Sequence, residues 1–369
     1  MRVNNRGAKT WDVIIVGGGI IGLSLAIALR KRGAKVLIVE RGEPGREASS
    51  AAGGMLVDCA IETQPALQTL ATASARMYPE FAHELEIESD TKVDLRDKGT
   101  ILFPPATCLR SIACLAHSGS RTAALFPARS AELEPALAEP NPVREAFYLK
   151  ERSIDPRALT AAAIKTAKNR GVDFSSGDPV TSVDFRDGRA AGVTTPKTFF
   201  RAPKIVNGAG AWSGQIAPHA FPTRPVKGQM LCLVSPAREL LKHVIRSPEV
   251  YLVPRSDGRI VVGSTIEESG FDKRTDAATI QRLHRAAIAM VPELRNAKIL
   301  EDWAGLRPGT PDALPILGET ATPGYYVATG HFRDGILLAP ITARTMAQIV
   351  SGEAPDYDLT AFSPHRFTL

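Results

Sequence analysis

The hydrophobic positions near the start of the chain predict a strand, a helix and a second strand in quick succession. Residues 13–16 are all β-branched, which is typical of a buried parallel strand. Residues 23–32 are rich in leucine and alanine and predict a helix, which Gly33 ends. Residues 35–39 predict the next strand, which closes on Glu40. This order is typical of a β-α-β unit with a parallel sheet.

The rest of the chain predicts strands and helices in less regular alternation. A helix is expected at 155–170, where Asp155 can cap it and Pro156 suits its first turn. Residues 62–88 predict two helices separated at Pro79, because proline lacks the amide donor. Helices are also expected at 277–290, at 336–349 and in parts of 111–137, and strands at 94–103, 147–149, 172–174, 180–185, 190–194, 204–207, 229–235, 250–254, 259–264, 298–307 and 325–328.

Glycines stand where the first strand turns into the first helix. Gly17, Gly19 and Gly22 have the spacing G-x-G-x-x-G, and Glu40 follows at about the 20-residue distance expected of an acid that binds ribose hydroxyls. The helix N-terminus offers free amides to phosphates. The pattern predicts an adenine dinucleotide site. A signal peptide or membrane span over 13–29 is the alternative, but its glycines and the lack of a small-residue cleavage site argue against it.

Two further segments run into small residues. Residues 48–55 include Ala48, Ser49, Gly53, Gly54 and Met55, which suit either a flat ligand lying close to the backbone or a helix-packing face. The strand at 204–207 continues into Gly208, Gly210 and Trp212, much as the first strand does. We therefore expect this strand to return to the same sheet.

Composition narrows the class of protein. The chain has 369 residues, of which 44% are hydrophobic and 23% charged, so it can build two globular domains. The net charge of +6 is spread without a dense basic block, so nucleic-acid binding is a minor hypothesis. Four irregularly spaced cysteines favour free thiols in a reducing compartment. We expect a soluble cytoplasmic protein that does not enter a membrane, with a loose polar leader at 1–10.

Five motifs of this chain resemble those of the D-amino acid oxidase superfamily of FAD-dependent amine oxidases, and within it the glycine oxidase family of thiamine biosynthesis. They lie at 17–22, 49–56, 251–255, 303–310 and 330–340. The resemblance implies an α/β (α+β) fold, with a Rossmann-like FAD-binding domain and an inserted antiparallel β-sheet substrate domain. The discontinuous FAD-binding domain would comprise 11–90, 150–222 and 300–369, and the substrate-binding domain 91–149 and 223–299.

The resemblance also implies a non-covalent FAD site, since no cysteine follows Cys232. The ADP half would lie on Ile20, Ile21, Glu40 and Arg41, and the backbone of Val180 would touch the adenine side. Ala48, Ser49, Gly53, Gly54 and Met55 would line the pyrophosphate and flavin, and 331–337 would run under the isoalloxazine. The expected cofactor-binding residues are Gly17, Gly19, Ile20, Ile21, Gly22, Glu40, Arg41, Ala48, Ser49, Gly53, Gly54, Met55, Val180, Gly208, Gly210, Trp212, Gly330, His331, Phe332, Arg333, Asp334, Gly335, Ile336 and Leu337.

For the substrate, the resemblance implies that Arg307 and Tyr251 bind a carboxylate, with Arg333 as a further active-site arginine. A planar carboxylate suits arginine, which can donate two parallel charge-assisted hydrogen bonds. The alternatives are a surface ion pair for Arg307, a core position for Tyr251 and an exposed loop for Arg333. His331 is expected to be structural, and no residue is assigned as an acid or a base.

The chain departs from the family's pattern at two places that we expect near the pocket. Ile266 stands where characterised glycine oxidases have methionine, and 249–250 stand where a histidine is familiar. These differences leave the preferred amine open.

The resulting hypothesis is oxidative deamination of glycine or another small amino acid, such as sarcosine or D-alanine. Hydride would pass to flavin N5, and O2 would be reduced to H2O2. The alternatives are a related D-amino acid dehydrogenase, a sarcosine or other secondary-amine oxidase, a tRNA-modifying flavoenzyme, and a non-catalytic dinucleotide-binding protein. The expected partners are a small amino acid and O2, without nucleic acid, and a homo-oligomer is allowed.

Overall fold

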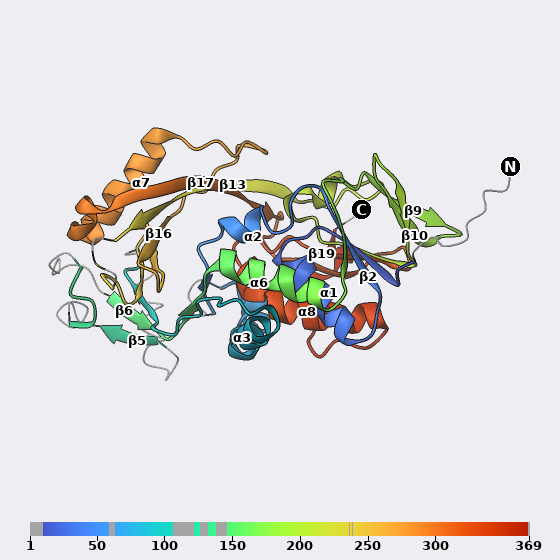
Figure 1. The fold of residues 1–369 in the computed structure, drawn as a ribbon, viewed down its shortest axis with the longest axis horizontal. Helices are drawn as coiled ribbons and strands as arrows, with labels where there is room; N and C mark the ends of the chain where they lie inside the picture. The colour runs from blue at the N-terminus through green and yellow to red at the C-terminus, as the bar shows by residue number, and fades with distance from the viewer. Residues whose placement is uncertain are drawn as a thin grey trace.

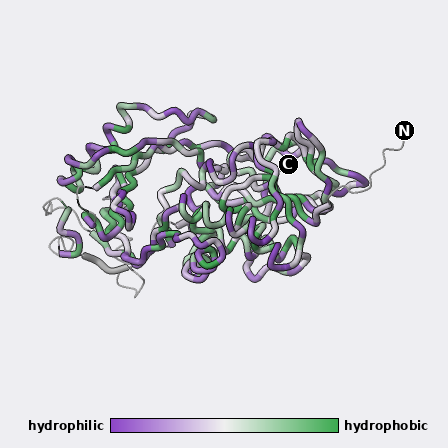
Figure 2. Tube along the Cα trace, viewed as in Figure 1, coloured by the Kyte–Doolittle hydropathy of each residue, from purple (hydrophilic) through white to green (hydrophobic). Residues whose placement is uncertain are grey.

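The computed structural model describes residues 10–58, 63–105, 122–125, 132–137, 146–235, 237 and 239–367. Two large sheets dominate this part of the chain. The eight-stranded sheet with helix α7 (Ala277–Met290) lies at one end, and the six-stranded sheet with its helices lies toward the other (Figure 1). Figure 2 shows hydrophobic residues concentrated along the central strands and hydrophilic ones at the outer turns. The α/β fold class is confirmed.

The six-stranded sheet is built around the first predicted strand, β1 (Val13–Val16). It pairs in parallel with β2 (Val36–Glu40) on one side and with β12 (Lys204–Asn207) on the other, as the glycine-ended pattern of 204–210 predicted. The sheet is completed by the parallel strands β8 (Asp173–Ser176) and β19 (Tyr325–Thr329) and the antiparallel strand β18 (Ile316–Glu319). The carboxyl ends of β1, β2 and β12 therefore lie together.

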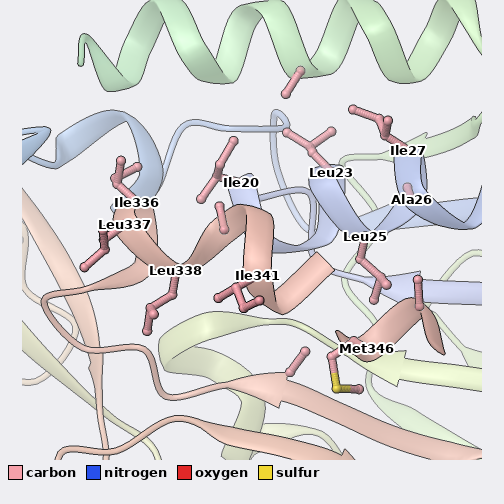
Figure 3. Packing of buried hydrophobic residues seen from close by; sticks show 14 of the residues in the cluster. Ile20, Leu23, Leu25, Ala26, Ile27, Ile336, Leu337, Leu338, Ile341 and Met346 are labelled. Carbon is pink, nitrogen blue, oxygen red and sulfur yellow. The ribbon is translucent and has the colours of Figure 1, made fainter. Parts of the chain in front are cut away.

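Helices cover one face of this sheet. They are α1 (Ile20–Lys31), α3 (Gln68–Ser89), α6 (Pro156–Asn169) and α8 (Gly335–Ser351). Side chains of α1 and α8 meet in one buried cluster that includes Ile20, Leu23, Ile336 and Ile341 (Figure 3). The opposite face packs on a small antiparallel sheet of β9 (Ser182–Arg186), β10 (Arg189–Thr194) and β11 (Phe199–Arg201). The strands are hydrophobic on both sides because both faces are covered.

The predicted break at Pro79 is wrong, because α3 continues through it from Gln68 to Ser89. A proline inside a helix leaves the carbonyl four residues earlier without its amide donor. Here that carbonyl belongs to Ala75, and it accepts a hydrogen bond from Nη1 of Arg152 at 3.2 Å. A side chain from another element therefore replaces the missing donor.

The eight-stranded sheet has the order β17-β13-β16-β15-β14-β4-β6-β5 and is mostly antiparallel. Helix α7 packs on it through Ile280, Leu283 and Ala287. The strands are β17 (Lys298–Gly309), β13 (Arg224–Val234), β16 (Arg259–Gly263), β15 (Tyr251–Pro254), β14 (Val244–Arg246), β4 (Thr100–Leu102), β6 (Ala146–Leu149) and β5 (Thr122–Leu125). We predicted that the substrate-binding domain ends before residue 300, but β17 of the eight-stranded sheet runs to Gly309. If each domain is assigned one large sheet, this boundary moves beyond residue 309, and the division into two domains stays a prediction.

Several predictions fall partly outside the described residues. The helical segments expected within 111–137 lie mostly outside them, and residues 122–125 form a strand instead. Residues 1–9 of the expected leader and Cys59, Cys108 and Cys114 also lie outside, whereas Cys232 is a buried free thiol. The smaller elements are α2 (Ala48–Ala51), the strands β3 (Met55–Leu56) and β7 (Arg152–Ser153), and short 3-10 turns. Among the described helices, none combines the length and apolar character that crossing a bilayer requires.

The close contact of α1 with β1 gives a first prediction. A Cβ added at Gly22 would lie 2.1 Å from the carbonyl oxygen of Gly17 and 3.2 Å from Cγ2 of Ile15. Gly22→Ala should therefore lower the free energy of unfolding by at least about 2 kcal/mol, because the helix must move away from the sheet. Urea unfolding measures this change.

Ser24→Ala is the matched control on the same helix. Ser24 is 2% exposed, and its hydroxyl has no hydrogen-bond partner among the described residues, so its removal should be neutral or stabilising. Equal stability of Gly22→Ala and the wild type would contradict the close-packing argument.

Candidate cofactor and substrate site

A cavity of about 500 Å³ runs from the β1–α1 turn to strand β17. The ends of β1, β2 and β12 line one part of it, and β13, β15 and β17 of the eight-stranded sheet line another. It therefore lies between the two large sheets, at the carboxyl ends of the parallel strands, where open α/β sheets bind their ligands.

Glu40 anchors the nucleotide end of the cavity. Its carboxylate accepts hydrogen bonds from the amide of Gly18 at 2.7 Å and from the amide of Gly42 at 2.9 Å. Nearby, the hydroxyl of Ser49 accepts from the amide of Ile20 at 2.9 Å and so caps the start of α1. These bonds fix the acid beside the glycine turn, as the dinucleotide pattern requires.

The loop between β16 and α7 of the eight-stranded sheet also reaches the nucleotide end. The guanidinium of Arg41 lies 3.9 Å from the ring centroid of Trp212, and that ring packs at 5.1 Å against Phe271 of the loop between β16 and α7. Glu47 forms ion pairs with Arg41 at 3.5 Å and with Lys273 of the same loop at 3.1 Å. Segments distant in sequence thus enclose the nucleotide end.

The middle of the cavity is lined by Gly53 and Gly54. A Cβ at Gly54 would lie 2.0 Å from the carbonyl oxygen of Ile154, and one at Gly53 would lie 3.1 Å from the ring of Tyr251. The Gly53 carbonyl also accepts from Nη2 of buried Arg255 at 2.7 Å. Gly54 therefore has no room for a Cβ, and a Cβ at Gly53 would need the Tyr251 ring to shift, so a flat ligand can approach this backbone closely.

Arg307 and Tyr251 lie together at the other end of the cavity, which we call the substrate end, and Arg333 reaches the same end from an exposed turn before α8. The guanidinium of Arg307 donates to the Thr265 carbonyl at 3.1 Å and to the Ser264 hydroxyl at 2.8 Å. Burial lowers the pKa of Arg307, and the nearby charge of Arg333 acts in the same direction. Arginine nevertheless stays protonated in proteins. Among the ion pairs of the described residues, none includes Arg307 or Arg333.

Two strand glycines that sequence reasoning missed make room for these side chains. A Cβ at Gly228 of β13 would lie 2.4 Å from the guanidinium of Arg307, and one at Gly263 of β16 would lie 2.5 Å from the hydroxyl of Tyr251. The available signal was that Gly263 lies inside the strand predicted at 259–264 and that Gly228 directly precedes the one predicted at 229–235, since glycine in a strand often marks a close approach. Only the pairing of the strands shows which side chain approaches each glycine.

The two departures from the family's pattern do not lie in the cavity. Ile266 is 58% exposed, Glu249 is exposed and Val250 is buried in the core beneath α7, so these positions stand close in sequence to the lining residues Tyr251 and Ser264 without lining the cavity themselves. Neighbouring residues of a strand point to opposite faces, so Val250 faces away from the cavity when Tyr251 faces it. Met230, Arg246 and Ser247 line this end instead, with Arg246 ion-paired to Glu151 at 3.0 Å.

Most residues expected to bind the cofactor line the cavity; the exceptions are Gly22, Gly330 and Leu337. Gly22 packs α1 against β1, Gly330 has no room for a Cβ beside Thr310, and Leu337 is 1% exposed in the core. Sequence reasoning missed several lining residues in strands and turns, among them Val16, Val39, Glu47, Ala51, Ala52, Val57, Pro179, Gln215, Leu306, Pro308, Ala328 and Thr329. The individual cofactor contacts stay predictions.

His331 lines the cavity but is a poor candidate for a base. It is 3% exposed, and its Nε2 lies 3.1 Å from the hydroxyl of Thr342. Burial lowers its pKa to about 3, so the ring is neutral at ordinary pH. This agrees with the expectation of a structural histidine.

The donors and shape of this cavity suit FAD. An acid fixed beside a glycine turn suits a ribose, glycine backbone in the middle suits a pyrophosphate and flat rings, and the first turn of α8 reaches the cavity at Gly335 and Ile336. The arrangement defines a class: a dinucleotide-binding flavoprotein whose substrate end is cationic and suits a small anion.

Comparison with known proteins gives the family. The family described as FAD dependent oxidoreductase matches residues 12–349, and the chain belongs to it. The family's cofactor is FAD, and the resemblance to glycine oxidases is confirmed.

Individual relatives sharpen the comparison. The chain is 32% identical to the glycine oxidase of Pseudomonas aeruginosa, over 95% of this chain and 98% of that protein. The crystal structure of glycine oxidase from Geobacillus kaustophilus matches with a TM-score of 0.93 at 31% identity, covering 98% of this chain and 100% of that one. The bifunctional protein ThiO/ThiG of Trichormus variabilis is 34% identical over 97% of this chain, which spans only 55% of that protein.

The buried imidazole of His331 gives a second prediction. Its pKa is about 3 in the folded protein and about 6.5 in an unfolded chain. Between these values the unfolded state binds more protons, so the stability due to neutral His331 is present above pH ~6.5 and is lost as the pH falls. His331→Gln should therefore lose less Tm than the wild type between about pH 7.5 and about pH 5.

Thermal unfolding at the two pH values checks this difference. His365→Gln is the control, because His365 is exposed, and its variant should keep the wild-type pH dependence. Identical pH dependence in His331→Gln and the wild type would mean that the imidazole does not stay neutral in the fold.

Proposed function

We propose that this protein catalyses the oxidative deamination of glycine or another small amino acid, such as sarcosine or D-alanine, and reduces O2 to H2O2. The observation that carries the proposal is the guanidinium of Arg307, which faces the cavity without a carboxylate partner among the described residues. A desolvated cation of this kind favours an anionic ligand. The likeness to glycine oxidases supports an amino acid as that ligand.

The substrate end offers several hydrogen-bond donors that a carboxylate would accept from. Arg307 would donate two parallel charge-assisted hydrogen bonds, and the Tyr251 hydroxyl would add a neutral donor. Arg333 adds a second positive charge at the same end. Because Tyr251 packs directly on Gly53, a carboxylate held by these groups lies beside the glycine segment proposed to carry the flavin.

The chain's own part in the reaction is orientation. When bound, FAD supplies the acceptor for the hydride that leaves the substrate Cα. The acidic residues that line the cavity are Glu40 and Glu47 at the nucleotide end and Asp334 before α8, while His331 is neutral and bonded to Thr342. The rate would therefore rest on holding the Cα–H near the flavin rather than on a protein acid or base.

The wider setting is proposed from the relatives. Because proteins named bifunctional protein ThiO/ThiG contain a region similar to this chain, we propose that the reaction belongs to thiamine biosynthesis. A cytoplasmic location and a homo-oligomeric state stay predictions. We propose O2 as the electron acceptor. The alternative is a dehydrogenase that passes the electrons to another acceptor.

The third prediction concerns the reaction itself. The purified protein should be yellow, and glycine, sarcosine or D-alanine should bleach its visible absorption without O2, because the substrate reduces the flavin. Admission of O2 should restore the colour and release H2O2. Bleaching without peroxide formation would identify a dehydrogenase, and an unbleached flavoprotein would contradict amino acid oxidation.

The fourth prediction concerns the carboxylate clamp. Arg307→Ala should raise KM for glycine by about 100-fold, equivalent to about 3 kcal/mol, because two charge-assisted hydrogen bonds to the substrate are lost. Steady-state kinetics with peroxide detection measure this effect. Arg274→Ala is the control, since Arg274 is 88% exposed and pairs only with the neighbouring Asp272 among the described residues. Unchanged KM in Arg307→Ala would exclude the clamp.

A further inference from the structure

Helix α8 contains a proline where a helix does not normally tolerate one. Gly335 and Ile336, in its first turn, line the cavity, and Pro340 follows one turn later. Pro340 has no amide to donate to the carbonyl of Ile336, and its ring crowds that carbonyl. The first turn of α8 is therefore held less firmly by the helix's own hydrogen bonds than a regular turn.

Two side chains of α3 replace the missing bonds, and the two helices pack side by side (Figure 1). The hydroxyl of Tyr78 donates to the Ile336 carbonyl at 2.5 Å. The hydroxyl of Ser74 donates to the Leu337 carbonyl at 2.6 Å and accepts from the Ile341 amide at 3.4 Å, so it sits inside the helix's hydrogen-bond ladder. Ser74 and Tyr78 are one helical turn apart, which places both on the same face of α3.

Both hydroxyls are out of reach of water. Ser74 and Tyr78 are each 0% exposed, so no solvent molecule can take over the hydrogen bond to Ile336 if the Tyr78 hydroxyl is removed. Burial also raises the pKa of Tyr78, which keeps the hydroxyl protonated and able to donate. The direction of the first turn of α8 therefore depends on α3.

We propose that Tyr78 and Ser74 are positioning residues that aim the first turn of α8 at the isoalloxazine ring of FAD. The inference rests on the proposed function for the place of the flavin. The amides and positive dipole end of α8 favour the negative charge that a reduced flavin carries. A turn that is poorly aimed would bind FAD more weakly and would favour reduction less.

Tyr78→Phe tests the proposal, because it removes only the hydroxyl. Titration of the FAD-free protein by intrinsic fluorescence should show the Kd for FAD raised about tenfold, the cost of one buried unpaired carbonyl. Reduction with dithionite against a reference dye should show a more negative midpoint potential. Neither measurement requires turnover of a substrate.

Restoring the helix's own donor separates hydrogen bonding from packing. Pro340→Ala provides a main-chain amide four residues after Ile336, so Tyr78→Phe/Pro340→Ala should recover the wild-type Kd to within about threefold. If Tyr78→Phe binds FAD and is reduced like the wild type, the proposal is overturned. It is also overturned if the double variant stays as impaired as the single one, because Tyr78 would then act through packing.

Two controls and one milder variant complete the set. Arg152→Met removes the donor that serves the carbonyl freed by Pro79, away from the cavity, and should lower stability without shifting the flavin potential. Tyr357→Phe changes a tyrosine that packs on the same core and makes no hydrogen bond among the described residues. It should change neither the Kd for FAD nor the midpoint potential. If Tyr78→Phe does not fold, Ser74→Ala and Tyr78→Phe/Pro340→Ala are compared with the wild type instead, by the same Kd for FAD and the same midpoint potential.

Measurements on the wild type separate failure of this proposal from failure of the proposed function. If the wild type binds FAD but no amino acid bleaches it, the proposed reaction fails while the roles of Tyr78 and Ser74 can still be measured. If amino acids bleach the wild type and Tyr78→Phe keeps both Kd and potential, the proposed reaction stands and the positioning role fails.

Discussion

The hydrogen bonds of one buried guanidinium join strand β15 of the eight-stranded sheet to the glycine segment of the cavity and to the turn before α6. Arg255, at the end of β15, is 3% exposed and donates to the carbonyls of Ile154 at 2.9 Å and Gly53 at 2.7 Å. Its charge is offset by the nearby carboxylate of Asp155, which also caps α6 and forms an ion pair with Arg259 at 2.8 Å. A buried arginine without such partners would be strongly destabilising. The contact therefore fixes β15, and with it Tyr251, against the glycine segment of the cavity.

The two ends of the cavity treat charge in opposite ways. At the nucleotide end, Glu40, Arg41 and Glu47 have hydrogen bonds or ion pairs within the chain. At the substrate end, Arg307 donates to neutral oxygens of Ser264 and Thr265, and it forms no ion pair with a carboxylate among the described residues, so its charge is oriented but not directly paired. A desolvated cation in this state gains most from a small anion. The guanidinium of Arg307 is therefore placed to bind an anionic ligand.

Proline in the helices shows how tertiary contacts complete local structure. Pro79 and Pro340 each free a carbonyl one turn earlier, and side chains from other elements, Arg152 and Tyr78, bond those carbonyls. The break that we expected at Pro79 did not occur for this reason. A local rule states what proline removes, but not which distant side chain replaces it.

The local pattern of the sequence was sufficient for the nucleotide half. β-branched runs, the glycine spacing and the capped start at Asp155 determined β1, α1, β2 and α6, because these signals act between residues close in sequence. The family resemblance then placed Arg307, Tyr251 and Arg333 in one site, and in the structure all three line the cavity, with Tyr251 and Arg333 near enough to act on the charge of Arg307. The tertiary structure alone decided that Ile266 faces solvent, that Gly228 and Gly263 make room for the clamp, and that α3 holds α8. These features depend on strand register and helix packing, which are set by contacts between residues far apart in the chain.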